Sequence, residues 1–492
     1  MNEGRSPDTW SAVNGNGPWF SERGVWCEPI DALRSVHDSA QPLLLESADT
    51  GSPLGRYSFL MWDPIRTTRV PVATRDPLAE LRTWLAAHRV SSEPALPPFQ
   101  GGLAGLWSYD LGRSFESIPE PRWDEFGVPA LCVGLYDTVM AWDHHQQRCW
   151  LVSQGLDESL VPSEQRARES LRRAALKTHT APEPNATRDA KSPVSEDSLH
   201  GQLESLAVAH PIADAVKSVG VEVWSSFSRD GFLQAVAAGI EAIRAGDIFQ
   251  VNLAHRLATR VVDSGPRLYE RMRVRNAAPF AGYFDTGRET IISASPERLF
   301  KVRDSVVESR PIKGTTHRSW FPESDFAAAA ELQASAKDRA ENIMIVDLLR
   351  NDLSRVCQED SMRVTQLCEV ERFRYVQHLV SAIEGRLRPA CDALDVVEAV
   401  FPGGSITGAP KIRAMELIAE IEPTARGAYC GSLGYIGFDG AADFSILIRT
   451  VTESRGWWTF PVGGGIVVGS SPEKEYQETW HKARGLLTAL KP

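Results

Sequence analysis

The sequence lacks the cysteine pattern, the long apolar runs and the excess of positive charge that mark several large classes of protein. Its seven cysteines are scattered, odd in number and form no C-x-x-C pair, which argues against a disulfide framework or a zinc ribbon. No uncharged apolar stretch reaches the roughly 18 residues that cross a bilayer. The formal net charge is −11, and an acidic surface repels phosphate backbones. We therefore expect no membrane and no nucleic-acid partner.

Motifs for nucleotide binding and for amidotransferase chemistry are also missing. The spacing in GGGIVVG fits no dinucleotide fingerprint, GGSITGAPK fails the P-loop pattern, and no G-x-C-x-G nucleophile motif is visible. The first thirteen residues carry Glu3 and Asp8 without an apolar core, so we expect no secretory signal. With 42% hydrophobic and 24% charged residues, the composition is typical of a globular protein, which we expect to be cytoplasmic.

Composition divides the chain into three segments. Residues 1–155 contain short strand-like runs separated by Gly and Pro, which predicts a β-rich unit. Residues 156–220 hold a charged helix, RARESLRRAALK, and then a stretch typical of a flexible linker. In residues 221–492 strands cluster without regular βαβ alternation, which favours an α+β fold with mainly antiparallel sheet.

Periodicity places the main elements. In IFQVN it predicts a strand with Phe249, Val251 and Leu253 on one face and Gln250 and Asn252 on the other. A further strand is expected over DFSILIRTVT, residues 443–452. Helices are expected over residues 77–88, 327–354, 410–421 and 472–490.

One candidate for chemistry is Lys313, in SRPIKGTTHR. A lysine beside a turn is usually a solvated surface group. The alternative is a nucleophilic amine, which needs desolvation, a neighbouring cation or a carboxylate base, because a free lysine is almost wholly protonated at neutral pH.

Three glutamates are candidates for a metal site. Glu341 begins the apolar run of KDRAENIMIVDLLRNDL, which indicates a buried helix, so its carboxylate needs a metal or an ion pair with Arg339 or Arg350. Glu475 and Glu478 are three residues apart and share a helix face. Together the three could hold Mg²⁺, although such a pair is more often a solvated face.

Other residues suggest a site for a small carboxylate. Arg449 lies in an apolar strand and needs a partner, which is either internal or a substrate carboxylate. The glycines at 463–465 predict a turn whose main-chain N–H groups approach an anion. His378 lies in an apolar run, where a histidine is more often part of the core than a catalyst.

Six motifs in succession resemble the chorismate-utilising enzymes. They are GDIFQVNLAHR, SASPERLF, RPIKGT, DRAENIMIVDLLRNDL, FPGGSITGAPK and GGGIVVGSSPEKEYQET. The resemblance implies an α+β fold in which two orthogonal, mainly antiparallel sheets pack as a sandwich with helices outside. It covers nearly all of residues 227–490, so residues 221–492 are expected to be the chorismate-binding catalytic domain. The first 155 residues match the family more loosely.

The resemblance also implies roles for individual residues. Mg²⁺ would be held by glutamates and would bind the ring carboxylate of chorismate, whose second carboxylate would be held by an arginine, a tyrosine and glycine main chain. The implied metal residues are Glu341, Glu478 and Glu475; the catalytic residues are Lys313, Glu297 and His378; and the substrate-binding residues are Arg449, Tyr429, Gly463, Gly464, Gly465, Thr315 and Lys482.

Two positions indicate the branch of the family. Gln250 stands where isochorismate and salicylate synthases carry a lysine base, which disfavours that branch. Lys313 resembles the lysine of aminodeoxychorismate synthases, whereas anthranilate synthases read P-I-A-G-T. The resemblance thus implies amination of chorismate to 4-amino-4-deoxychorismate, on the route to 4-aminobenzoate and folate, with ammonia from a glutamine amidotransferase subunit. The alternatives are an anthranilate synthase large subunit and a regulatory homologue without activity.

The segment LLLES, with GRYSF, resembles the tryptophan-binding region of anthranilate synthases. The residues concerned are Glu46, Ser47, Tyr57 and Ser58. The other interpretation is a buried edge strand, and an inhibitory ligand, a structural ligand and an empty pocket remain alternatives.

Overall fold

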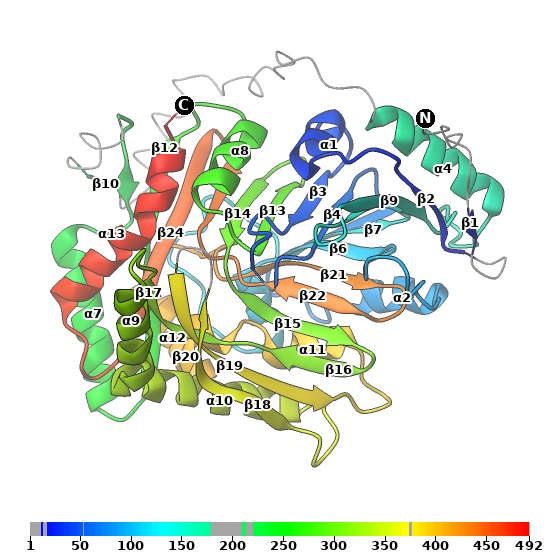
Figure 1. The fold of residues 1–492 in the computed structure, drawn as a ribbon. Helices are drawn as coiled ribbons and strands as arrows, with labels where there is room; N and C mark the ends of the chain where they lie inside the picture. The colour runs from blue at the N-terminus through cyan, green and yellow to red at the C-terminus, as the bar shows by residue number, and fades with distance from the viewer. Residues whose placement is uncertain are drawn as a thin grey trace.

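Two antiparallel sheets, each built from strands far apart in the sequence, form the frame of the molecule (Figure 1). The computed structural model describes residues 11–12, 17–52, 54–178, 209–212, 220–372 and 376–491. The first sheet has the order β1 (Ser11–Ala12), β2 (Trp19–Glu22), β9 (Arg148–Ser153), β8 (Thr138–Asp143), β4 (Tyr57–Met61), β3 (Leu43–Glu46), β13 (Phe280–Asp285), β14 (Thr290–Ser295), β23 (Thr450–Ser454), β24 (Trp457–Ile466), β12 (Gln250–Arg260), β11 (Trp224–Ser225) and β10 (His210–Pro211), with β20 (Gly408–Ala409) beside β12.

The second sheet begins at the strand that carries Lys313. Its order is β17 (Ile312–His317), β19 (Val376–Arg386), β16 (Val306–Ser309), β15 (Arg298–Arg303), β22 (Ala442–Ser445), β21 (Ser432–Gly437), β6 (Gly102–Trp107), β7 (Leu131–Tyr136) and β5 (Arg66–Val70), with β18 (Arg363–Arg372) beside β19. Strands from the first 155 residues therefore lie in both sheets, next to strands from the C-terminal half.

The sheets pack face to face around an apolar core, which confirms the expected α+β sandwich. Phe59 of β4 contacts Tyr435 of β21 with ring centroids 5.4 Å apart, and both side chains are buried. Leu43 of β3 and Leu433 of β21 belong to the same core cluster. Burial of such aliphatic and aromatic side chains is the main force that holds two sheets together.

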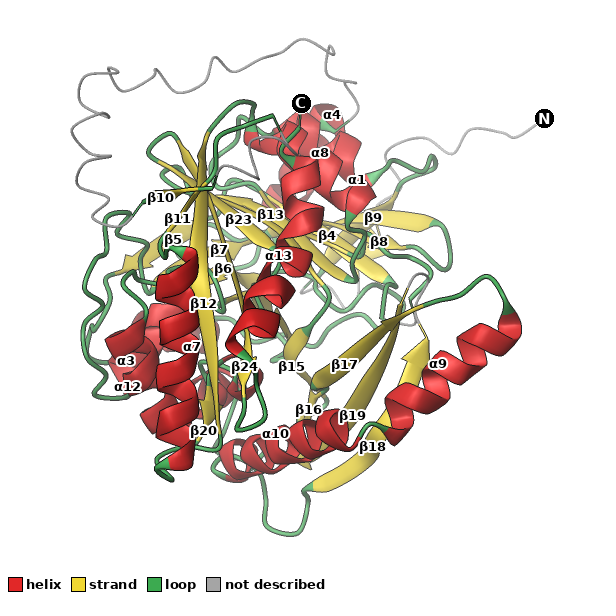
Figure 2. Cartoon of the chain, turned by 90° about the vertical axis from the view of Figure 1, so that its left-hand side faces the viewer, coloured by secondary structure: helices red, strands yellow, loops and turns green. Residues whose placement is uncertain are grey.

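Helices cover the outer surfaces (Figure 2). Their bounds are α1 (Pro29–Val36), α2 (Ala79–Ala87), α3 (Gly112–Phe115), α4 (Glu164–Lys177), α7 (Arg229–Arg244), α8 (Gly265–Arg275), α9 (Pro322–Ala334), α10 (Ala336–Ser354), α11 (Ala393–Val400), α12 (Lys411–Ile421) and α13 (Pro472–Ala489). Helix α4 confirms the expected charged helix. Most of the expected linker lies outside the described residues. In the described ranges, none of the helices has both the length and the apolar character of a membrane span.

The single helix expected over residues 327–354 is wrong. Helix α9 begins earlier, with Pro322 in its first turn, and the chain breaks at Ser335, whose ψ of 107° is extended. The Ser335 side chain accepts a hydrogen bond from the backbone N–H of Asp338 and so caps α10. The alanine-rich sequence hides this break, because alanine favours helix on both sides of it. The break gives α10 its own direction beneath β19.

A buried ion pair ties several elements together behind the second sheet. Arg426 and Glu422 are 3% and 6% exposed and are joined by two hydrogen bonds, of 2.6 and 2.9 Å. Arg426 also donates to the backbone oxygens of Ile406 and Asn252. Every charge in this pair is thus satisfied, as burial requires.

We expect Arg426→Met to destabilise the protein by about 3–5 kcal/mol, because Glu422 would remain buried without its partner. Urea unfolding followed by circular dichroism measures the loss. Arg413→Met is the matched control, since the pairs of Arg413 with Glu416 and Glu420 are largely solvated and should contribute at most about 1 kcal/mol. Equal losses in the two variants would contradict the prediction.

Candidate active site

The site is organised around Lys313, which a β-bulge directs away from the regular ladder. The register of β17 against β19 shifts between Lys313 and Thr315, and Gly314 between them has φ of 70°. A Cβ on Gly314 would lie 2.7 Å from Leu332, so glycine is required for both its conformation and its space. The Lys313 amine donates to the backbone oxygen of Ser405 at 3.4 Å.

Glu297 lies beside this amine. It follows β14 and is 7% exposed, and the Ser405 hydroxyl donates to its Oε1 at 3.0 Å. Burial raises the pKa of Glu297, while Lys313 opposes that shift. Burial also lowers the pKa of Lys313, and Glu297 opposes it. Since burial moves the two pKa values towards each other, the pair is suited to passing a proton between a carboxyl and an amine.

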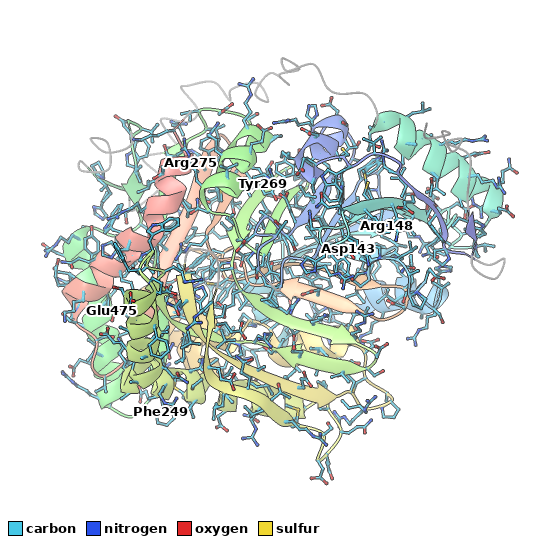
Figure 3. All side chains as sticks on the ribbon, in the orientation of Figure 1. Asp143, Arg148, Phe249, Tyr269, Arg275 and Glu475 are labelled. Carbon is cyan, nitrogen blue, oxygen red and sulfur yellow. The ribbon has the colours of Figure 1, made fainter. Side chains whose placement is uncertain are left out.

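Three glutamates come from two helices, and the charges of Glu341 and Glu478 act on the pKa of Lys313. Glu341 is on α10, and Glu475 and Glu478 are on α13; Figure 3 labels Glu475. Burial raises the pKa of Glu341 and Glu475, and the charges of Lys313 and Lys482 act on the cluster. In contrast, Lys482 lowers the pKa of Glu478, which it contacts at 2.7 Å.

Two features of this cluster fit a divalent cation. Carboxylate oxygens are the ligands that Mg²⁺ prefers, and Oε1 of Glu341 is buried without a hydrogen-bond partner in the described part of the chain. Lys337 lies 3.8 Å from that oxygen. Across the residues that the structure describes, no three Asp, Glu, His or Cys side chains are yet close enough to ligate one ion. The donor set is therefore suitable, but the carboxylates do not form a closed cage.

The glycines at 463–465 lie in strand β24, so the turn expected there is wrong. They pair with Asn252, Leu253 and Ala254 of β12. Gly464 faces the carboxylates, because a Cβ there would lie 3.5 Å from both Glu475 and Lys482. Lys482 donates to the backbone oxygen of Gly463 at 2.8 Å. Gly464 therefore leaves the space beside the acidic cluster free of a side chain, whereas a Cβ on Gly463 or Gly465 would meet β12.

Arg449 lies where the chain passes from the second sheet to the first. The prediction of a single strand over residues 443–452 is therefore wrong. Strand β22 ends at Ser445 in the second sheet, and β23 begins at Thr450 in the first. Arg449 has φ of 53°, which ends the alternation of side chains. Its guanidinium forms no ion pair with any residue that the structure describes, and burial lowers its pKa. Such a cation is available to an anionic ligand.

Tyr429 and His378 complete this side of the site. Tyr429 is buried, and the Arg426 guanidinium lies 5.8 Å from the centroid of its ring. The Thr315 hydroxyl and Nδ1 of His378 are hydrogen-bonded at 2.8 Å across β17 and β19. Burial lowers the pKa of His378 to about 4, with Arg449 contributing, so the ring is neutral at neutral pH.

Strand β12 differs from the expected alternation. Phe249 precedes the strand and is 71% exposed at the lower edge of the molecule in Figure 3. Gln250 is fully buried, and neither of its amide atoms has a partner among the described residues. Strand β20 pairs with β12 at its edge, and α7 and α12 pack against Val251 and Leu253. Residues on both faces of β12 are buried, so the polar residues did not mark an exposed face.

The four residues of the expected tryptophan region form a separate cluster on β3 and β4. Glu46 is 2% exposed and binds Arg273 at 2.6 Å and the Tyr269 hydroxyl at 2.5 Å. The backbone N–H of Ser47 donates to the Ser58 hydroxyl oxygen, which is also hydrogen-bonded to His144. Tyr57 is half-buried. These contacts hold the cluster together, and tryptophan binding there stays a prediction.

Ser405 is a residue that sequence reasoning missed. It contacts both Lys313 and Glu297, yet it stands in FPGGSITGAPK among small residues that predict only a loop. Only the resemblance of this motif to the family could have pointed to Ser405. Of the predicted residues, Glu475, Glu478 and Lys482 meet beside Gly464, and Thr315 is hydrogen-bonded to His378.

Comparison with known proteins gives consistent matches. The model of the family described as chorismate binding enzyme matches residues 41–488. Aminodeoxychorismate synthase component 1 of Salmonella typhimurium is 38% identical over 464 residues, covering 91% of this chain and 92% of its own. Anthranilate synthase component 1 of Thermus thermophilus is 36% identical over 473 residues, covering 94% and 95%. The solved anthranilate synthase component I of Streptococcus pneumoniae superposes with a TM-score of 0.72 at 30% identity, covering 89% of this chain and 93% of that one.

Proposed function

Because this chain belongs to the chorismate binding enzyme family, we propose that it replaces the C4 hydroxyl of chorismate by an amine. The product is 4-amino-4-deoxychorismate, on the route to 4-aminobenzoate and folate. The observation that carries this proposal is that Ser405 links the amine of Lys313 to the carboxyl of Glu297, with one hydrogen bond to each group. Relatives named for anthranilate synthesis match almost as well as those named for aminodeoxychorismate synthesis, so the choice rests on Lys313.

The chemistry is two successive displacements. The neutral amine of Lys313 forms a bond to C2 of chorismate, both ring double bonds shift by one position, and the C4–O bond breaks. Glu297 gives its proton to the departing hydroxyl, which leaves as water, and then takes a proton from the attached amine. Ammonia next bonds to C4, both double bonds shift back, and the C2–N bond breaks. Glu297 gives its proton to the departing nitrogen of Lys313 and takes one from the new ammonium group, so both residues return to their starting forms. Two displacements keep the position and the stereochemistry of the substituent.

Mg²⁺ is the proposed cofactor, held by Glu341 and Glu478 with Glu475 close by. The orphaned oxygen of Glu341 and the carboxylate donors support this assignment. When bound, the ion neutralises the ring carboxylate of chorismate and the charge that develops near it. Gly464 leaves space for that carboxylate beside the glutamates.

The second carboxylate of chorismate is the proposed partner of Arg449, with Tyr429 and the main chain of Gly463–Gly465 beside it. His378 is neutral and lies near the reacting carbons, where with Thr315 it bounds the ring. Lys482 extends from α13 to the backbone of Gly463 and adds positive charge at the same edge. These groups bind and orient the substrate without taking part in bond changes.

We expect Arg449→Met to raise KM for chorismate by about ten- to a hundredfold with a smaller change in kcat, because a charged hydrogen bond to the substrate is lost. Steady-state kinetics with varied chorismate measures the split. Arg288→Met serves as the control, since Arg288 is exposed in the turn between β13 and β14. A fall in kcat with an unchanged KM would contradict a binding role.

Ammonia is proposed to come from a separate glutamine amidotransferase subunit. The names of the relatives as component 1 support a second component, and the sequence shows no amidotransferase nucleophile motif. The proposed partner therefore supplies the nitrogen, and free ammonium salt should replace it in a purified system.

The test is to incubate the purified chain with chorismate, Mg²⁺ and ammonium salt at mildly alkaline pH and to identify the product by mass spectrometry. The expected product is the 4-amino compound, which an added lyase converts to 4-aminobenzoate. Fluorescent anthranilate would instead assign the chain to the alternative reaction. Unchanged chorismate, with and without an amidotransferase, would support the regulatory alternative.

A further inference from the structure

The short segment of residues 403–408 is held by hydrogen bonds from two other parts of the chain. It contains the helical turn η2 (Gly404–Ile406). Arg426 donates to the backbone oxygen of Ile406 at 2.9 Å, and the backbone N–H of Asn252 donates to the oxygen of Thr407 at 2.7 Å. Because each contact is buried, the segment presents Ser405 to the site in one defined position.

Ser405 makes a different contact with each of the two reacting groups. Its backbone oxygen accepts from the amine of Lys313 at 3.4 Å, and its hydroxyl donates to Oε1 of Glu297 at 3.0 Å. The residue is 7% exposed. Ser405 therefore bridges the amine and the carboxyl, with its backbone oxygen on one side and its hydroxyl on the other.

We infer that Ser405 is a positioning residue that links Lys313 to Glu297 and favours the charged form of each group. The roles of Lys313 and Glu297 in this statement rest on the proposed function. The hydroxyl of Ser405 is a donor, so it stabilises the carboxylate form of Glu297. The backbone oxygen of Ser405 accepts from the protonated amine of Lys313. Both contacts therefore favour the charged forms of the two groups over their neutral forms.

The other groups that act on Glu297 belong to three separate elements. Lys313 on β17 and Lys482 on α13 stabilise its carboxylate, and the Cys430 thiol also interacts with it. The backbone N–H of Ile312 supplies a further hydrogen bond. None of these groups is removed when the Ser405 hydroxyl is deleted, so the effect of the hydroxyl can be measured alone.

Ser405→Ala should favour the neutral forms of Glu297 and Lys313, because the hydrogen bond that stabilises the Glu297 carboxylate is lost. A hydrogen bond to a charged group corresponds to about one pKa unit, so the neutral amine should become about tenfold more abundant near neutral pH. Below the pKa of Glu297 both groups are protonated in either protein, and the difference should vanish. The difference between the variant and the wild type in the abundance of the neutral amine is thus expected only near neutral pH.

The experiment measures the rate at which an amine-selective acylating reagent labels Lys313 in the full chain, by peptide mass spectrometry, at neutral and at acidic pH. Lys301 is an internal reference, because it is half-buried in the same sheet and interacts with Arg298 and Asp443 instead. Labelling of Lys313 relative to Lys301 should rise by about tenfold in Ser405→Ala and return to the wild-type value in Ser405→Thr.

A matched variant separates this effect from general loosening of the fold. Ser445 is as buried as Ser405 and bonds only to the backbone of Leu433, so Ser445→Ala should leave the ratio unchanged. An unchanged ratio in Ser405→Ala, or an equal rise in both alanine variants, would overturn the inference. The result does not depend on product formation, so failure of the wild type to make the 4-amino compound would overturn the proposed function alone.

Discussion

Lys313→Ala is expected to abolish formation of 4-amino-4-deoxychorismate, with a fall in rate of at least about a thousandfold. Without the amine, no covalent adduct forms at C2, and ammonia attacks that carbon directly. The resulting compound carries the amine at C2, as in anthranilate synthesis. The measurement is the ratio of the two amino products by mass spectrometry after incubation with chorismate, Mg²⁺ and ammonium salt.

Lys301→Ala is the matched control for this variant. Lys301 lies on β15 of the same sheet, and burial also lowers its pKa, but it is not near Glu297 or the glutamates. Its replacement should leave both the rate and the product unchanged. If Lys313→Ala still made the 4-amino product at a similar rate, the covalent route would be wrong and ammonia would have to reach C4 without the lysine.

Glu341→Gln is expected to weaken Mg²⁺ binding by about a hundredfold or more. Loss of groups that merely support metal ligands already costs ten- to a hundredfold, and Glu341 is proposed to bind the ion itself. The amide keeps the size of the side chain and removes its charge, so the fold should be retained. Isothermal titration with Mg²⁺ in the absence of substrate measures the change directly, and the activity should recover only at high Mg²⁺.

Asp347→Asn tests whether removal of any charge on α10 has this effect. Asp347 is 83% exposed on the same helix and pairs only loosely with Arg350, at 3.8 Å. Its neutralisation should leave Mg²⁺ affinity within a factor of about two, since a solvated pair contributes little. Equal Mg²⁺ affinity in Glu341→Gln and the wild type would remove Glu341 from the metal site.

Local signals in the sequence predicted most helices well. The charged helix α4 and the helices α12 and α13 have the expected positions, because their apolar periodicity and their Pro or Ser starts are encoded within a few residues. The break at Ser335 was missed since alanine-rich flanks favour helix on both sides. The sequence contained the start signal of α9, Pro322 followed by acidic residues, which the alanine run outweighed.

Properties that depend on distant pairing could not be predicted from local pattern. The residues around Arg449 have the alternation of one strand, but β22 and β23 belong to different sheets, and only the fold determines where the chain crosses. The glycines at 463–465 are typical of a turn, yet pairing with β12 holds them extended. Ser405 has no distinguishing chemistry until the fold brings it to Lys313.

The motifs predicted the members of the candidate site more completely than its geometry. The motifs named glutamates that the fold places on two helices, Glu341 on α10 and Glu475 and Glu478 on α13. Their separation could not be inferred, because it depends on how two helices more than a hundred residues apart pack on the sheets. His378 is neutral because burial lowers its pKa, and the apolar residues around it in the sequence indicate that burial only in part.

The pairing of strands from opposite ends of the chain has a consequence for how the protein is made. β3 pairs with β13, and β6 pairs with β21, whose last residue is Gly437. While a ribosome is still translating the first half, both early strands present unsatisfied hydrogen-bonding edges to solvent. Neither sheet can close before nearly nine-tenths of the chain has been made, so those edges stay open to wrong pairing until translation is almost complete.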